Sequence, residues 1–138
     1  MVMKKILVGV DGSNESRAAI AFAANLARPA GAKVLLVYVV QPYSAGRQLP
    51  EAWDVPERSY AAALLNELER ECVQREVVAE GRTAVGNVAE ALAQMAKDEG
   101  ADLAVVGHRG RGAVARAVMG SVADRLVQIS SVPVLVVR

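Results

Sequence analysis

The sequence is poor in the residue types from which most metal and redox sites are built. Of its 138 residues, one is a cysteine, Cys72, and one is a histidine, His108. An intrachain disulfide and a CxxC site are therefore excluded, and so are sites that need several histidines. Aromatic residues make up 4% of the chain. Its core must therefore consist mainly of small and β-branched aliphatic side chains, as in a layered helix-on-sheet protein.

The chain also lacks an excess of charge and a long apolar run. Sixteen basic residues are balanced by fifteen acidic ones, which gives no electrostatic reason to expect nucleic acid or an anionic membrane as a partner. No apolar segment approaches the ~18–20 residues needed to span a bilayer, and the N-terminus has no signal-peptide pattern. We therefore expect a cytoplasmic protein, and the length predicts a single domain over residues 1–138.

Short apolar runs alternate with helical segments along the chain. Runs that are apolar almost throughout predict strands buried on both faces, as in a parallel sheet. A weaker segment at about Glu76–Gly81 predicts a third, edge-like strand. The four apolar runs are Ile6–Val10, Val34–Val40, Asp102–Gly107 and Pro133–Val137.

Helix signals lie between these runs. Ser13 is a good N-cap for a first helix, which Pro29 and Gly31 are expected to end. The 16-residue stretch 41–56 reads as a long loop, of the kind that is functional or mobile in compact domains. A second helix is expected from about Glu57, with one side that faces the core and carries Tyr60, Leu64, Leu65, Leu68 and Cys72.

Two more helices are expected towards the C-terminus. Asn87 followed by Glu90 resembles a capping box and opens a third helix, which closes at Gly100. A fourth covers roughly Ser121–Ser130. The alternation of strands and helices predicts a three-layer, doubly wound, five-stranded parallel sheet of the α/β class. In such sheets ligands bind beyond the carboxyl ends of the strands, which here places Asp11 beside the loop from Gly107.

The loop after the fourth strand contains the spaced set G-x-x-G-x9-G-S, formed by Gly107, Gly110 and Gly120-Ser121. Glycine allows backbone N–H groups to approach a ligand oxygen, and Gly120-Ser121 falls at a helix start, which favours an anion. No acidic residue occurs between Gly107 and Ala123, so we favour a phosphate site over a merely structural turn. Neither a Walker A sequence nor GxGxxG is present, which argues against P-loop and dinucleotide folds.

Taken together, these segments make the sequence resemble the universal stress protein family. The resemblance rests on the first and fourth strands with their following loops, the glycine set with its nine-residue gap, and the closing apolar strand. It covers essentially the whole chain and is weakest over residues 41–86. The complete glycine set resembles that of the ATP-binding members, so the resemblance implies ATP binding, a flavodoxin-like strand order 3-2-1-4-5 and a homodimer. Mg²⁺ is a candidate companion ion of the ATP.

The resemblance also implies a set of nucleotide-binding residues. Asp11 and Val10 are expected near the adenosine, and the backbone of Val39 near the adenine. The ribose and phosphates are expected along the glycine loop, and the phosphate tail at the start of the fourth helix. The alternative for Asp11 is a helix cap, and loop arginines such as Arg109 and Arg111 are as often solvated as paired with phosphate. The loop and helix residues in this set are Val106, Gly107, His108, Arg109, Gly110, Gly120, Ser121 and Val122.

Three functions remain open from the sequence. The first is a regulatory stress-response protein in which bound ATP tunes stability or a partner surface; the second is a slow ATP hydrolase; the third is a nucleotide-free interaction module. Catalytic groups near the glycine loop are few, so we expect binding rather than turnover. The apolar strand Val134–Val137 would be an exposed edge, and pairing with its copy in a homodimer would cover it.

Overall fold

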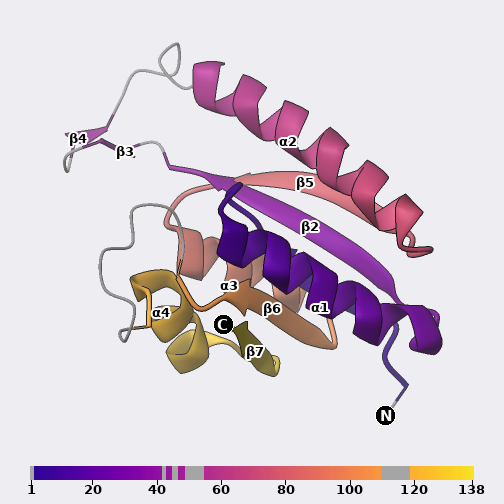
Figure 1. Ribbon diagram of the computed structural model, residues 1–138. Helices are drawn as coiled ribbons and strands as arrows, with labels where there is room; N and C mark the ends of the chain where they lie inside the picture. The colour runs from indigo at the N-terminus through magenta and orange to yellow at the C-terminus, as the bar shows by residue number, and fades with distance from the viewer. Residues whose placement is uncertain (1, 42, 45–46, 49–54, 110–118) are drawn as a thin grey trace.

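The chain folds around a five-stranded parallel sheet (Figure 1). The computed structural model describes residues 2–41, 43–44, 47–48, 55–109 and 119–138. The sheet order is β5-β2-β1-β6-β7; counted within the sheet this is 3-2-1-4-5, so the predicted fold class is confirmed. The elements in chain order are β1 (Lys5–Gly9), α1 (Asn14–Ala30), β2 (Lys33–Val40), β3 (Tyr43–Ser44), β4 (Arg47–Gln48), α2 (Val55–Gln74), β5 (Ala79–Val85), α3 (Val88–Asp98), β6 (Leu103–Gly107), α4 (Ser121–Ile129) and β7 (Val134–Val137).

Helices cover both faces of the sheet and produce two apolar cores. Alternate residues of each strand point to opposite faces, so Ile6 and Val8 of β1 pack with α1 and α2. Leu7, between them, packs with α3 and α4 on the other face. The central strands β1 and β2 are buried on both sides, which explains why their sequences are apolar without alternation.

The ends of α1 follow from its sequence, with one difference from expectation. The Ser13 hydroxyl accepts a hydrogen bond from the Ser16 amide at 3.1 Å, which caps the helix as predicted. Pro29 does not end the helix, which continues to Ala30. Proline has a helical φ and removes only one hydrogen bond there. Gly31 ends the helix instead, because its φ of 66° is left-handed.

Three further expectations needed correction. The third sheet strand spans Ala79–Val85, later than the predicted Glu76–Gly81, because Glu76 takes a positive φ of 62° in the preceding turn. Within the stretch expected to be loop, β3 and β4 form an antiparallel pair, and α2 already begins at Val55. Tyr60 is 42% exposed rather than buried. Leu64, Leu65, Leu68 and Cys72 do face the core as expected.

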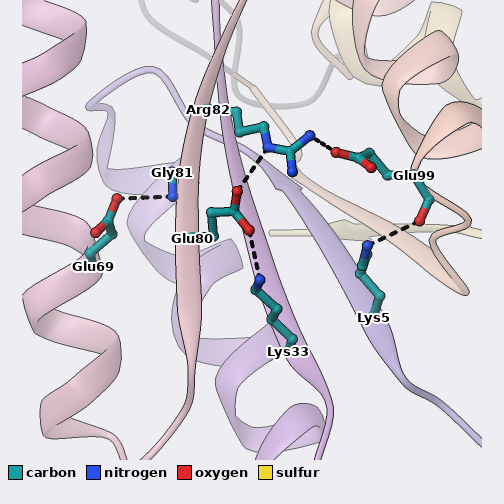
Figure 2. Close-up of polar contacts among 7 residues, drawn as sticks. All are labelled: Lys5, Lys33, Glu69, Glu80, Gly81, Arg82 and Glu99. Atoms are coloured by element: carbon teal, nitrogen blue, oxygen red, sulfur yellow. Dashed lines mark hydrogen bonds and ion pairs between the residues drawn. The ribbon is translucent and has the colours of Figure 1, made fainter.

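The edge strand β5 is positioned by charged side chains, which is why its sequence is a poor strand signal. Glu80 accepts hydrogen bonds from Lys33 Nζ at 2.6 Å and from Arg82 Nε at 3.0 Å, and Arg82 also pairs with Glu99 at the end of α3 (Figure 2). Both hydrogen bonds lower the pKa of Glu80, and the one from Lys33 has the larger effect. On the α2 side, the Gly81 amide donates to the Glu69 carboxylate at 2.9 Å.

Within the described part of the chain, no helix is long and apolar enough to cross a membrane.

Candidate functional site

A cavity of about 210 Å³ opens where β1, β2 and β6 end. Doubly wound sheets bind ligands at this position. β2 and β6, the strands on the two sides of β1, lead into helices on opposite faces of the sheet, so the loops after them diverge. Seven of the residues expected at the site line the cavity, and the described lining as a whole comes from both faces of the sheet. The expected residues among the lining are Val10, Asp11, Val39, Val106, Gly107, Arg109 and Val122, and the others are Gly9, Ser13, Ser16, Val37, Tyr38, Gln41, Glu57, Val88 and Leu92.

One wall of the cavity is apolar. Val37 and Val39 of β2 and Val106 of β6 belong to the core beneath α3 and α4, together with Leu92 of α3. Val122, in the first turn of α4, packs against the same core. Apolar lining combined with a few fixed polar groups is the usual composition of a small-molecule site, and an aromatic base fits such a wall.

The backbone of Val39 extends this wall beyond the end of β1. Strand pairing between β1 and β2 ends at Gly9 opposite Val37, whose carbonyl accepts from the Val10 amide at 2.9 Å. Val40 points the other way, because its carbonyl accepts from Gly86 at 3.0 Å beside β5. Backbone groups alternate in direction along a strand. The N–H and C=O of Val39 therefore face the β1 side, past the last strand pair and towards the cavity.

The loop after β1 forms the polar wall of the cavity and provides the N-cap of α1. Asp11 Oδ1 accepts a hydrogen bond from the Ser13 amide at 2.9 Å, while the hydroxyl of Ser16 donates to the Ser13 carbonyl at 3.0 Å. Gly12 makes this turn with a φ of 83°. Asp11 thus supports the turn before the cap, while the cap itself is Ser13 and not Asp11, the alternative left open by the sequence. Asp11 also lines the cavity.

Tyr38 and Glu57 add a polar pair that sequence reasoning missed. Tyr38 is buried, with 1% of its surface exposed, and its hydroxyl donates to the Glu57 carboxylate at the start of α2. The ring of Tyr60 meets that of Tyr38 edge-on, with centroids 5.9 Å apart. Tyr38 lies in an apolar run and Glu57 at a helix start, so neither residue carried a local signal of a site. Only the packing of α2 over β2 brings them together.

Gly107 serves close packing rather than an unusual backbone conformation. A Cβ at Gly107 would lie 2.8 Å from the backbone C and O atoms of Glu15. The end of β6 can therefore approach the first turn of α1 only because residue 107 has no side chain. This approach also brings Arg109 to Glu15, where Arg109 Nη2 lies 3.3 Å from Glu15 Oε1.

The glycine loop leaves and returns at one place. The His108 amide donates to the Val137 carbonyl of β7 at 2.6 Å, and the His108 carbonyl accepts from the Gly120 amide at 2.8 Å. The side chain of His108 is buried. Gly110 and Arg111, two other residues of the expected phosphate loop, lie outside the described residues.

The helix that follows begins at a glycine, which has no side chain with which to cap it. Gly120 is the N-cap of α4, with φ −63° and ψ 155°, and no side chain of the described chain accepts from the first turn. Ser121 is exposed at the first helical position, and Val122 next to it reaches the cavity. Uncapped N–H groups and the helix dipole attract an anion.

Among the described residues, no three histidine, cysteine, aspartate or glutamate side chains are grouped so that they could hold a metal ion. Asp124, the acidic residue in the first turn of α4, accepts a hydrogen bond from Gln128 at 3.2 Å on the helix surface.

Comparisons with known proteins agree with this architecture. The family model described as "Universal stress protein family" matches residues 3–138. A universal stress protein of Thermus aquaticus is 35% identical over 145 residues, which cover 99% of this chain and all of the relative.

Two solved structures are similar over nearly their whole length. A universal stress protein family member from Burkholderia pseudomallei has 29% identity and a TM-score of 0.79, covering 99% of this chain and 96% of that one. A universal stress protein in complex with cAMP has 27% identity and a TM-score of 0.80, covering 100% and 99%. The chain described here belongs to the universal stress protein family.

Proposed function

We propose that the chain is a regulatory protein that binds ATP in the cavity at the ends of β1, β2 and β6, and whose stability or partner surface changes with occupancy. The observation that carries this proposal is a cavity whose apolar wall reaches Val122, in the first turn of a helix whose N-cap is a glycine without a side chain. An adenine nucleotide has a flat apolar end and an anionic end, and these two features match it.

The base belongs at the β2 side of the cavity in this proposal. The N–H and C=O of Val39 offer one donor and one acceptor next to Val37 and Val106, which suits the edge of an adenine ring. Asp11, at the polar wall, provides a carboxylate for donors of the adenosine. The solved relative with bound cAMP supports an adenine nucleotide as the ligand class.

The phosphates belong at the α4 side. The backbone N–H groups of Ser121 and Val122, the Ser121 hydroxyl and the glycine set G-x-x-G-x9-G-S are the features that support this placement. The full glycine set is also what favours ATP over nucleotides with fewer phosphates. Mg²⁺ would act as the counter-ion of the phosphates when bound.

The first test is to denature freshly purified protein and chromatograph the supernatant for released adenine nucleotide. A thermal shift with added ATP should accompany it, because ligand at ~100 times Kd adds ~2.7 kcal/mol to the free energy of unfolding. For a domain of this size that corresponds to a rise in Tm of roughly 5–15 °C. No released nucleotide and no shift would overturn the proposal, and product analysis after incubation with Mg·ATP separates binding from hydrolysis.

We also propose that β7 pairs with its copy in a homodimer. β7 is at the edge of the sheet, and its apolar residues Val134–Val137 are only half-buried within one chain. Antiparallel pairing would satisfy the outward backbone groups and cover these side chains. Analytical ultracentrifugation at micromolar concentration should show a dimer; a monomer alone would contradict this proposal.

A further inference from the structure

The described lining of the cavity is not cationic, although the proposed ligand is an anion. It contains one guanidinium, that of Arg109, and two carboxylates, those of Asp11 and Glu57. The charged groups that line the cavity therefore favour a phosphate only close to Arg109.

Arg109 is already engaged by an acid from a different part of the chain. Glu15, which lies 94 positions earlier, places its carboxylate 3.3 Å from the guanidinium. The two side chains are 22% and 29% exposed, so solvent screens their attraction only in part.

The position of Glu15 is fixed by two independent features. Its negative charge lies in the first turn of α1, where the helix dipole stabilises it. Its backbone is held against the end of β6, because Gly107 allows an approach that any Cβ would prevent. The backbone of Glu15 is therefore fixed within reach of Arg109, and a phosphate that contacts Arg109 has to compete with the Glu15 carboxylate.

We propose that Glu15 competes with the nucleotide phosphates for Arg109 and thereby limits how much affinity the site gains from each additional phosphate. This inference rests on the proposed nucleotide site and assigns it a specificity-determining residue. With Glu15 present, the site gains less from ATP over adenosine than its backbone donors and Arg109 would otherwise provide.

The test compares four ligands, adenosine, AMP, ADP and ATP, which share the base and ribose and differ in negative charge. Their affinities are measured by calorimetry without divalent cations for the wild type, Glu15→Gln, Arg109→Gln and the double variant. Glu15→Gln should tighten ATP by about three- to tenfold and leave adenosine within about twofold. In the Arg109→Gln background the same substitution should have little effect, because the contested cation is gone.

Glu80→Gln is the matched control. It removes the same charge from a carboxylate that is paired with Lys33 and Arg82 (Figure 2), towards the opposite end of the sheet. It should leave the ratio of ATP to adenosine affinity unchanged. The adenosine affinity of each variant also reports whether its cavity is intact.

The outcomes distinguish a failure of the Glu15 inference from a failure of the proposed nucleotide site. If Glu15→Gln weakens ATP, Glu15 orients Arg109 for the phosphate rather than competing with it, and the inference is wrong. If the gain persists in full without Arg109, Glu15 repels phosphate directly and the competition is likewise refuted. If the wild type binds none of the four ligands, the proposed function itself fails.

Discussion

Two helices begin at the same edge of the sheet, and their first turns differ. At α1, the side chains of Ser13 and Asp11 accept hydrogen bonds from backbone amides, and Glu15 adds a negative charge. At α4, the N-cap is Gly120, no described side chain caps the turn, and Ser121 is exposed. The N-cap of α1 thus provides a side-chain acceptor for the Ser16 amide, whereas no described side chain does this for the first turn of α4.

In the proposed complex, this difference would separate the two ends of the nucleotide. A helix N-terminus attracts anions in either case, but the loop before it decides whether the chain or a ligand provides the acceptor. The α1 side, where the carboxylate of Asp11 lines the cavity, then suits an uncharged group that donates hydrogen bonds. The α4 side, whose first-turn acid Asp124 pairs with Gln128 on the helix surface, suits phosphate. The proposed orientation of the nucleotide follows from this asymmetry.

The largest expected effect comes from adding an acid at the start of α4. Ser121→Asp places a carboxylate where the phosphates are proposed to bind, and should weaken ATP by about 30- to 100-fold through repulsion and competition for the backbone donors. The same variant should not lose stability, because the helix dipole stabilises a negative charge in the first turn. Calorimetry and thermal unfolding measure the two effects.

Asn14→Asp is the matched control, because Asn14 is the exposed first residue of α1. It adds the same charge at the equivalent position of the other helix and should change ATP affinity by less than about threefold. Equal losses in the two variants would remove the distinction between the helix starts.

The next effect concerns the close contact between the end of β6 and the first turn of α1. Gly107→Ala should lower the free energy of unfolding by about 1–3 kcal/mol, because the new Cβ would meet the backbone of Glu15 at 2.8 Å. Gly9→Ala should have a smaller effect, since its Cβ meets the end of the flexible Leu92 side chain. Chemical denaturation of both variants measures the difference, and a smaller effect at Gly107 would contradict the close packing.

Removal of the α1 cap should have a moderate effect on stability alone. Ser13→Ala leaves the Ser16 amide without its acceptor and should lower the free energy of unfolding by about 1 kcal/mol. Asn87→Ala, at the cap of α3, should lower it less, because the hydrogen bond from Glu90 is longer, at 3.5 Å. Loss of ATP binding in Ser13→Ala, with the fold intact, would place the phosphates at α1.

The smallest effect tests whether α4 can be made to resemble α1. Gly120→Ser fits the backbone, whose φ of −63° suits any residue, and supplies the missing cap. It should raise the free energy of unfolding by a few tenths of a kcal/mol. The hydroxyl would also compete with phosphate for the amides of the first turn, so ATP affinity should fall by about threefold. Tighter ATP binding would show that the cap and the phosphate do not share these donors.

The sequence predicted the fold where side chains act locally. The central strands are apolar throughout, and Ser13 and Asn87 cap their helices as expected. The edge strand β5 was misplaced because Glu80 and Arg82 are ordinary surface residues in the sequence. Their pairing with Lys33 and Glu99 depends on segments far apart in the chain.

Part of the site was also predictable, because some of its residues directly follow strands that the sequence identifies. Asp11 and Gly107 follow apolar strands, and strand topology places both at one edge. By contrast, Glu15 neutralises Arg109 from a position 94 residues away, so the absence of acids within the loop overstated the positive charge of the site. Tyr38 and Glu57 were missed because their meeting depends on how α2 packs over β2.

The most direct test of the account is an amide ¹H–¹⁵N NMR titration of the nucleotide-free protein with ATP. We expect large shifts for the amides of Val39, Ser121 and Val122, and a small one for Asn14 at the start of α1. Shifts concentrated at α1, or none at Val39 and α4 when ATP is saturating, would contradict the proposed placement of base and phosphates.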